Sequence, residues 1–177
     1  MKEFTLEEVN TMLRQYSSLR KEILQACADK NYDAIIKLYN RIHKTHLSLK
    51  IYVWEILCSH GQLDGVRYFI KHIPEAGDWI NDGLSISAIN AYPQLVSYFI
   101  IIGADVKCCR SESMRFVLEE ISYCLDNSEK QDQLKKLYEC AKILRDAGSE
   151  FPDTEIYSNN ESMQRKIESI IEQIKNS

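Results

Sequence analysis

Apolar residues recur at intervals of three and four along much of this chain, which is the spacing of an amphipathic helix. The first such pattern follows Thr5-Leu6-Glu7-Glu8, whose first and last residues can form a capping box at a helix start. The pair Ser17-Ser18 predicts a break, after which a second helix runs over residues 19–28. A third helix is predicted over residues 32–42, with one apolar face formed by Ile35, Leu38, Tyr39 and Ile42.

A helix–turn–helix pattern then recurs with an offset of 30 residues. Residues 54–70 and 84–100 align without gaps, and the positions that they share include Val66/Val96, Tyr68/Tyr98, Phe69/Phe99 and Ile70/Ile100. A step of 31 residues back brings residues 23–39 into the same frame, with a small pair and an apolar pair in register. Internal repeats of this length are typical of solenoids built from helix pairs.

These units resemble the ankyrin repeat, a unit of about 33 residues with two antiparallel helices and a projecting β-turn. The clearest match is residues 61–70, G-Q-L-D-G-V-R-Y-F-I, which is similar to the family's G-H-L-D-I-V-K-Y-L-I. Residues 101–106 match the family's helix ending, and residues 147–151 repeat that ending 45 residues later, so the fourth unit carries an insertion. The family's T-P-L-H start is absent from every unit, and HEAT-like helix pairs are the alternative.

The predicted fold is all-α: a helix–turn–helix solenoid of about four ankyrin-like repeats in a single domain over residues 1–177. An N-terminal capping helix (1–19) and a C-terminal capping helix (158–177) enclose the repeats (20–151) and close the core at both ends. Gly103 and Gly148 are expected to end their helices, because glycine adopts positive φ without a steric clash. The last helix carries an apolar stripe formed by Met163, Ile167, Ile170, Ile171 and Ile174.

Composition narrows the class of protein further. Only 6 glycines and 3 prolines are present, which favours helices over the many turns of an all-β fold. The net charge of -4, without a basic stripe, argues against a nucleic-acid partner. No stretch approaches the roughly 18 apolar residues that a membrane span needs, so we expect a soluble, cytoplasmic protein with no membrane partner. The six cysteines are read as reduced thiols, several of them in the core, with a disulfide framework as the alternative.

Residues with catalytic or metal-binding potential form no recognisable motif. The vicinal pair Cys108-Cys109 has no second thiol pair nearby, and it is interpreted as one packed and one exposed thiol. A zinc site could be built from His43, His46, Cys58 and His60, but Cys58 falls on a core position and His60 is expected to bond backbone groups at its turn. Neither a nucleophile with its base nor a phosphate-binding glycine loop is visible. We therefore predict no enzyme activity, no cofactor and no metal.

The ankyrin resemblance implies a protein-interaction module that binds a protein partner through a concave surface of projecting turns and first helices. Two such turns, or fingers, are predicted over residues 76–83 and 105–113. Trp79 on the first finger is a candidate anchor, because tryptophan is frequent at interface hot spots, unless it folds back onto the helices. The predicted partner-binding residues are Trp79, Asn81, Asp82, Lys107 and Arg110.

The short array, rich in Ile, Lys, Asn and Tyr, also resembles stand-alone ankyrin proteins of large DNA viruses or of bacteria that live inside eukaryotic cells. That resemblance implies a partner in the host and a place in the host cytoplasm. The alternative function is a small regulatory or inhibitor protein that binds an enzyme or a small ligand through the enlarged fourth unit. Its polar insertion, residues 125–133, would then carry the binding site.

Overall fold

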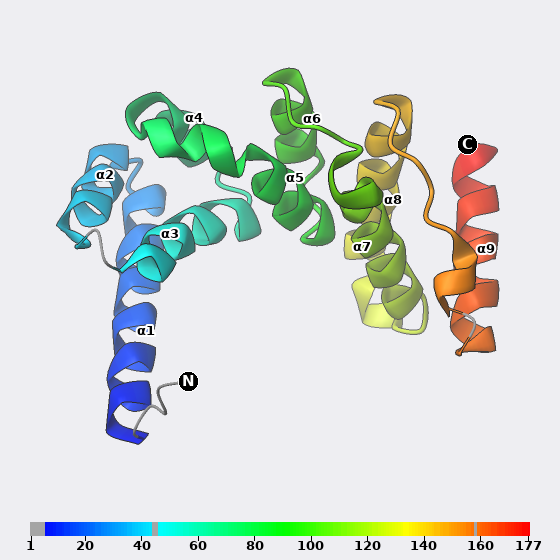
Figure 1. Ribbon diagram of the computed structural model, residues 1–177, viewed down its shortest axis with the longest axis horizontal. Coiled ribbons are helices and arrows are strands. Elements are labelled where there is room, and N and C mark those ends of the chain that lie inside the picture. Colours follow the sequence, from blue (N-terminus) through cyan, green and yellow to red (C-terminus); the bar gives the residue numbers. More distant parts are fainter. Residues whose placement is uncertain (1–5, 44–45, 158) are drawn as a thin grey trace. The chain divides into compact units, whose positions relative to one another are not determined.

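The computed structural model describes residues 6–43, 46–157 and 159–177. Within these ranges the secondary structure is entirely helical, without a strand, which confirms the all-α prediction (Figure 1). The chain divides into two compact units, Met1–Gly77 (unit 1) and Asp78–Ser177 (unit 2). No helix in the described ranges is long and apolar enough to cross a membrane.

Unit 1 is built from two helical hairpins. Its helices are α1 (Leu6–Ala28), α2 (Tyr32–Arg41), α3 (Leu47–Ser59) and α4 (Leu63–His72). The first hairpin packs on the second through contacts of α1 with α3 and of α2 with α4. Aromatic rings fill the space between them: the Phe69 ring centroid lies 5.2 Å from that of Tyr39 and 6.0 Å from that of Trp54. Trp54 is fully buried.

Helix α1 runs without interruption through Ser17 and Ser18, so the predicted break is wrong. Both serines are exposed, and the Ser18 hydroxyl donates to a Glu22 carboxylate oxygen 3.1 Å away on the next turn. Packing on α3 holds the helix together across this point, because the Tyr16 ring meets the Tyr52 ring with centroids 4.7 Å apart. The predicted N-terminal capping helix is therefore the first part of α1. Its capping box lies outside the described residues.

Unit 2 begins inside the 3₁₀ helix η1 (Pro74–Trp79). The hairpin of α5 (Ile80–Ile89) and α6 (Pro93–Ile101) is followed by a second pair, α7 (Cys108–Leu125) and α8 (Gln131–Asp146). The predicted insertion lengthens this second pair and forms the short helix η2 (Ser128–Lys130). After η3 (Thr154–Tyr157), helix α9 (Glu161–Lys175) packs on α7 and buries the predicted stripe residues Ile167, Ile170, Ile171 and Ile174.

Five helices end in the same left-handed turn, in which one residue of positive φ reverses the chain. These residues are Lys30, Gly61, Ala91, Gly103 and Gly148. In each turn, the residue after the left-handed one donates its N–H to a carbonyl five positions back, as Gln62 does to Leu57 at 3.0 Å. The first three turns are separated by the 31 and 30 residues of the sequence repeat. The predicted helix ends at Gly103 and Gly148 are confirmed.

Candidate functional site

The first predicted finger, residues 76–83, is helical, so the prediction of a projecting β-turn there is wrong. Its first half lies in η1, and the rest forms the first turn of α5, in which Gly83 is buried. Helix continues here because Ile80 and Leu84 are four residues apart and Leu84 is fully buried in unit 2. Trp79 is the N-cap residue of α5 and is half-buried, while Asp82 is exposed.

The second predicted finger, residues 105–113, is also wrong, because α7 begins at Cys108 and leaves only a short connection after α6. Lys107 is the N-cap residue of α7. Arg110 lies within α7, and its side chain is outside the part of the chain that the structure describes. No projecting turn therefore presents these two cations together.

Two of the predicted binding residues instead hold loops of unit 2 in place. The Asn81 side-chain oxygen accepts a hydrogen bond from the Asp105 N–H at 2.8 Å, and the Asp105 carboxylate accepts from the Lys107 N–H at 2.9 Å. The Lys107 ammonium pairs with the Glu150 carboxylate at 3.3 Å. Beside it, the Ser149 hydroxyl donates to the Val106 carbonyl at 3.1 Å. Asn81 and Lys107 thus lie in one network, and their polar groups are engaged within the chain.

The described cysteines and histidines do not converge on a metal site. Among the described residues, no three His, Cys, Asp or Glu side chains are close enough to hold a metal ion. Cys58 is buried, and His60 Nδ1 lies 3.0 Å from the Ile56 carbonyl, as its predicted role at the turn requires. The neighbouring Arg20 guanidinium lies 3.0 Å from His60 Nε2 and can only donate, so Nε2 accepts and Nδ1 carries the proton.

Four cysteines are buried in the core, as was predicted for several of them: Cys27, Cys58, Cys124 and Cys140. Burial raises the pKa of Cys27 to about 11 and that of Cys140 to about 12, since the thiolate is poorly solvated there. Cys108 is half-buried, and the Cys109 side chain lies outside the described residues. The four buried thiols are therefore suited to packing and not to nucleophilic chemistry.

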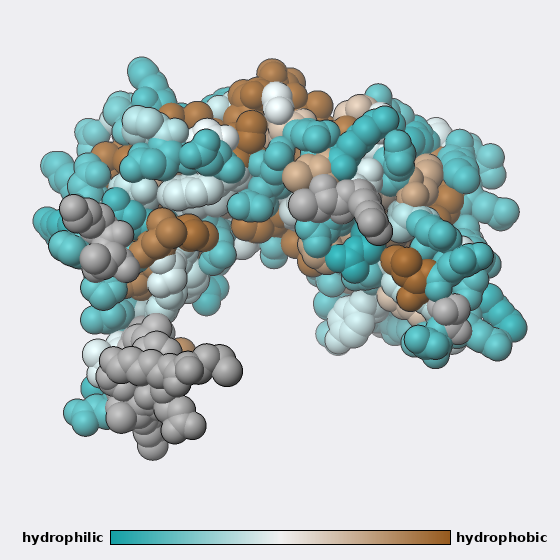
Figure 2. All heavy atoms as spheres, viewed as in Figure 1, coloured by the Kyte–Doolittle hydropathy of each residue, from teal (hydrophilic) through white to brown (hydrophobic). Residues whose placement is uncertain are grey.

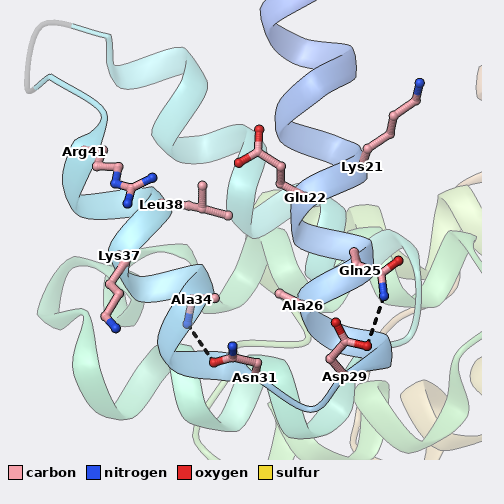
Figure 3. Close-up of a pocket in the computed structure, with 10 residues that line it drawn as sticks. All are labelled: Lys21, Glu22, Gln25, Ala26, Asp29, Asn31, Ala34, Lys37, Leu38 and Arg41. Carbon is pink, nitrogen blue, oxygen red and sulfur yellow. Dashed lines mark hydrogen bonds between the residues drawn. The ribbon is translucent and has the colours of Figure 1, made fainter.

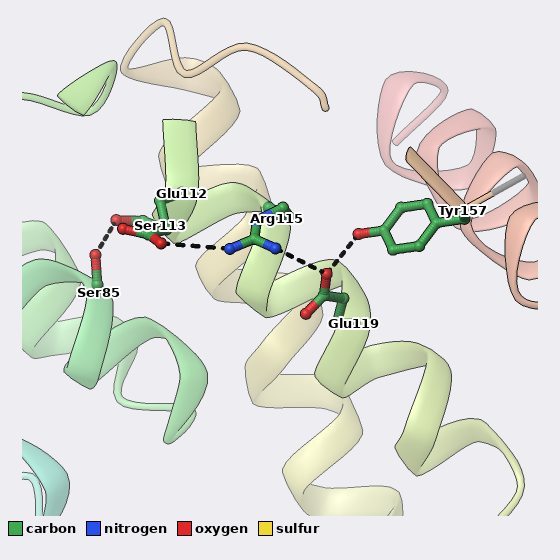
Figure 4. Close-up of polar contacts among 6 residues, drawn as sticks. All are labelled: Ser85, Glu112, Ser113, Arg115, Glu119 and Tyr157. Atoms are coloured by element: carbon green, nitrogen blue, oxygen red, sulfur yellow. Dashed lines mark hydrogen bonds and ion pairs between the residues drawn. The ribbon is translucent and has the colours of Figure 1, made fainter. Parts of the chain in front are cut away.

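One polar cluster of unit 2 crosses from α7 to η3 (Figure 4). Arg115 pairs with Glu112 at 3.3 Å and with Glu119 at 3.5 Å, and the Tyr157 hydroxyl donates to the same Glu119 carboxylate at 2.7 Å. Burial and the Glu119 carboxylate raise the pKa of Tyr157 well above its usual range. Both carboxylates of the cluster are paired with the Arg115 guanidinium, and Glu119 also accepts the hydrogen bond from Tyr157. The cluster therefore links η3 to α7.

An open groove lies between α1 and α2 of unit 1 (Figure 3), with a volume of about 550 Å³. Its floor is apolar: Ala26 of α1 is buried, and Ala34 and Leu38 of α2 are half-buried. The rim is polar and comes from both helices. It consists of Lys21, Glu22, Gln25, Asp29, Asn31, Lys37 and Arg41. A concave surface with an apolar floor and a charged rim is the usual form of a binding site.

The carboxylates of the groove accept hydrogen bonds from side chains of α1. Glu22 accepts from Ser18, and Asp29 accepts from the Gln25 side-chain amide at 3.0 Å (Figure 3). Within the described part of the chain, Lys21, Lys37 and Arg41 take part in no ion pair or hydrogen bond. The groove therefore offers three cations around an apolar floor.

Apolar side chains are exposed in only a few other places. Figure 2 shows apolar residues over α6, where Ile101 is 81% exposed, and smaller apolar areas elsewhere. Other exposed apolar side chains, such as Leu47 of α3 and Ile156 of η3, lie on different elements. The α1–α2 groove combines a concave shape with a polar rim and is therefore the better candidate site.

No protein-family model, curated protein or solved structure matches this chain. The resemblance to the ankyrin repeat therefore rests on the quoted residues alone, and the ankyrin-like solenoid stays a prediction.

Sequence reasoning missed the groove because the groove lies between two helices, and the residue spacing within either helix does not show how the two are placed. One signal was present: Ala34, Leu38 and Arg41 follow at helical spacing beside the buried stripe of Ile35 and Tyr39. When the apolar face of a helix is wider than a neighbouring helix can cover, the uncovered part indicates a second contact surface.

Proposed function

We propose that this chain is a non-enzymatic protein-interaction module, and that the α1–α2 groove of unit 1 holds a segment of its protein partner. The groove carries this proposal, because it joins an apolar floor to cations that form no ion pair within the described residues. Unlike the predicted fingers, it needs no projecting turn.

The ankyrin-like stacking of the helix pairs is part of the proposal. The left-handed turns at Lys30, Gly61 and Ala91 support it, since they repeat at the intervals of the sequence pattern. Ankyrin units generally bind proteins. The short array rich in Ile, Lys, Asn and Tyr resembles viral or bacterial ankyrin proteins, which favours a partner in the cytoplasm of a host cell. Free thiols fit that reducing compartment.

The alternative, binding through the fourth unit, has less support. The insertion joins α7 to α8, and its charged residues contact their own unit: Lys130 pairs with Glu120 at 3.8 Å, and Asp126 pairs with Lys166 of α9. The insertion thus serves packing in unit 2 and leaves few groups for a ligand.

Site-specific photocrosslinking in the native cell tests the proposal. A photoreactive residue in place of Lys37 is expected to crosslink one protein repeatedly, because Lys37 stands on the groove rim. The control places the same residue at Lys136, an exposed position of α8 in unit 2. Ala34→Arg, which fills the floor, should abolish the crosslink from position 37. If positions 37 and 136 capture the same proteins equally, the groove is not the binding surface.

A further inference from the structure

We propose that the segment bound in the α1–α2 groove is an acidic, amphipathic helix of the partner protein. This inference rests on the proposed function and names the chemistry of the occupant. Three observations carry it: the form of the groove walls, the state of the groove charges and the uneven charge of the two units.

Helical walls favour a helical occupant. The lining residues of α1 fall at positions 21, 22, 25 and 26 and those of α2 at 34, 37, 38 and 41, so each helix presents one face, and Asp29 and Asn31 come from the turn between the helices. The backbone groups of both walls are paired inside their own helices, and no strand edge exists here for an extended peptide to join. A helix needs only side-chain contacts, and the small Ala26 and Ala34 let it approach closely.

The groove charges favour an acidic occupant. Glu22 and Asp29 accept hydrogen bonds from Ser18 and Gln25, so part of their acceptor capacity is already used within the chain. Lys37 and Arg41 stand one turn apart on the α2 rim, on either side of Leu38 (Figure 3). Glutamates or aspartates on both sides of an apolar stripe can therefore pair with these cations while the stripe covers Leu38.

The net charge of -4 conceals a difference between the units. Unit 1 has 11 Lys and Arg against 9 Asp and Glu, a charge of +2, whereas unit 2 has 11 against 17, a charge of -6. An acidic partner is attracted to unit 1 and repelled by unit 2, which directs it to the groove. Nucleic acid is disfavoured, because the groove lining holds no aromatic side chain on which a base could stack.

A pair of probe peptides tests the inference against the full-length chain. Both are stapled helices of about 15 residues with leucines on one face, because unstapled peptides of this length are poorly helical. One carries glutamates beside the leucines, and the other carries lysines at the same positions. By fluorescence anisotropy, we expect the acidic peptide to bind at least about tenfold more tightly, with an affinity that falls as salt rises.

Charge-reversed variants locate the binding. Lys37→Glu with Arg41→Glu should weaken binding of the acidic peptide about tenfold or more and improve binding of the basic one. The matched control, Lys135→Glu with Lys136→Glu on α8, changes the net charge equally and should leave the affinity within about twofold. Lys37→Met with Arg41→Met removes both cations without adding acids, and it should also weaken binding of the acidic peptide. Circular dichroism and the emission of buried Trp54 verify that each variant is folded.

Several results would overturn the inference. These are equal affinity for the two peptides, equal weakening by the groove and control variants, or tighter binding of a single-stranded oligonucleotide than of the acidic peptide. A dimer in sedimentation that Lys37→Glu with Arg41→Glu dissociates would assign the groove to a second copy of the chain. If crosslinks from position 37 persist while the peptides bind alike, the proposed function stands and only the acidic helix is refuted.

Discussion

Lys30 ends α1 in a left-handed conformation that glycine tolerates better than lysine. Its φ is 52°, and its N–H donates to the Cys27 carbonyl at 3.0 Å. The side chain is exposed, so its removal loses little burial. At the equivalent place in α8, Gly148 has a φ of 92°, and a Cβ atom there would meet nothing within 4 Å. Substitutions at Lys30 and Gly148 therefore change stability mainly through the backbone conformation and only slightly through packing.

The magnitudes follow from two opposing effects. An L-residue in the left-handed region costs about 1–2 kcal/mol, whereas glycine adds about 0.4–1 kcal/mol of chain entropy to the unfolded state. Lys30→Gly should therefore stabilise unit 1 by about 0.5–1 kcal/mol. Gly148→Ala should destabilise unit 2 by a similar or larger amount, about 1–2 kcal/mol, because its φ lies farther from the conformation that alanine accepts.

The two tryptophans allow each unit to be measured separately. Trp54 belongs to unit 1 and Trp79 to unit 2, so Trp79→Phe leaves a probe of unit 1 and Trp54→Phe a probe of unit 2. Urea unfolding followed by fluorescence then gives the midpoint and slope for each unit. A change in midpoint at constant slope measures the change in the free energy of unfolding.

Two controls define the result that would refute this reasoning. Lys30→Ala keeps the left-handed strain and should change the stability of unit 1 little. Lys37→Gly, inside α2, should destabilise unit 1 by about 1 kcal/mol, because glycine is unfavourable in a helix interior. If Lys30→Gly destabilises unit 1 as Lys37→Gly does, the left-handed turn at residue 30 is not what ends α1.

Three further predictions concern the core and the polar cluster of unit 2. Tyr157→Phe should cost about 1 kcal/mol at neutral pH, because it removes a hydrogen bond to a carboxylate at a half-buried site. Since the folded pKa of Tyr157 is raised, unit 2 should lose stability as pH rises above about 10, and the variant should lose less over a series of urea titrations at increasing pH. A thiol reagent at pH 8, read by peptide mass spectrometry, should modify Cys108 and spare Cys140, and equal labelling would contradict the burial of Cys140. Ile174→Ala should destabilise unit 2 by about 2–5 kcal/mol and speed hydrogen exchange in α9, whereas unchanged exchange would show that α9 is held by other contacts.

Local spacing in the sequence was enough to predict most helices and their ends. The stripe of α9 follows from apolar periodicity, which is a property of neighbouring residues on one helix. The stops at Gly103 and Gly148 follow from the conformational freedom of glycine. Each of these features depends on a few consecutive residues, so no knowledge of distant contacts was needed.

Tertiary packing decided the remaining features. Ser17 and Ser18 favour a break by themselves, yet α1 continues because its far side packs on α3. The first predicted finger became helix because Leu84 is buried in unit 2. The groove exists only because a left-handed turn at Lys30 brings α2 back beside α1, so that Ala26 and Leu38 face one space. A surface shared by two helices depends on their relative placement, and the periodicity of either helix alone does not contain it.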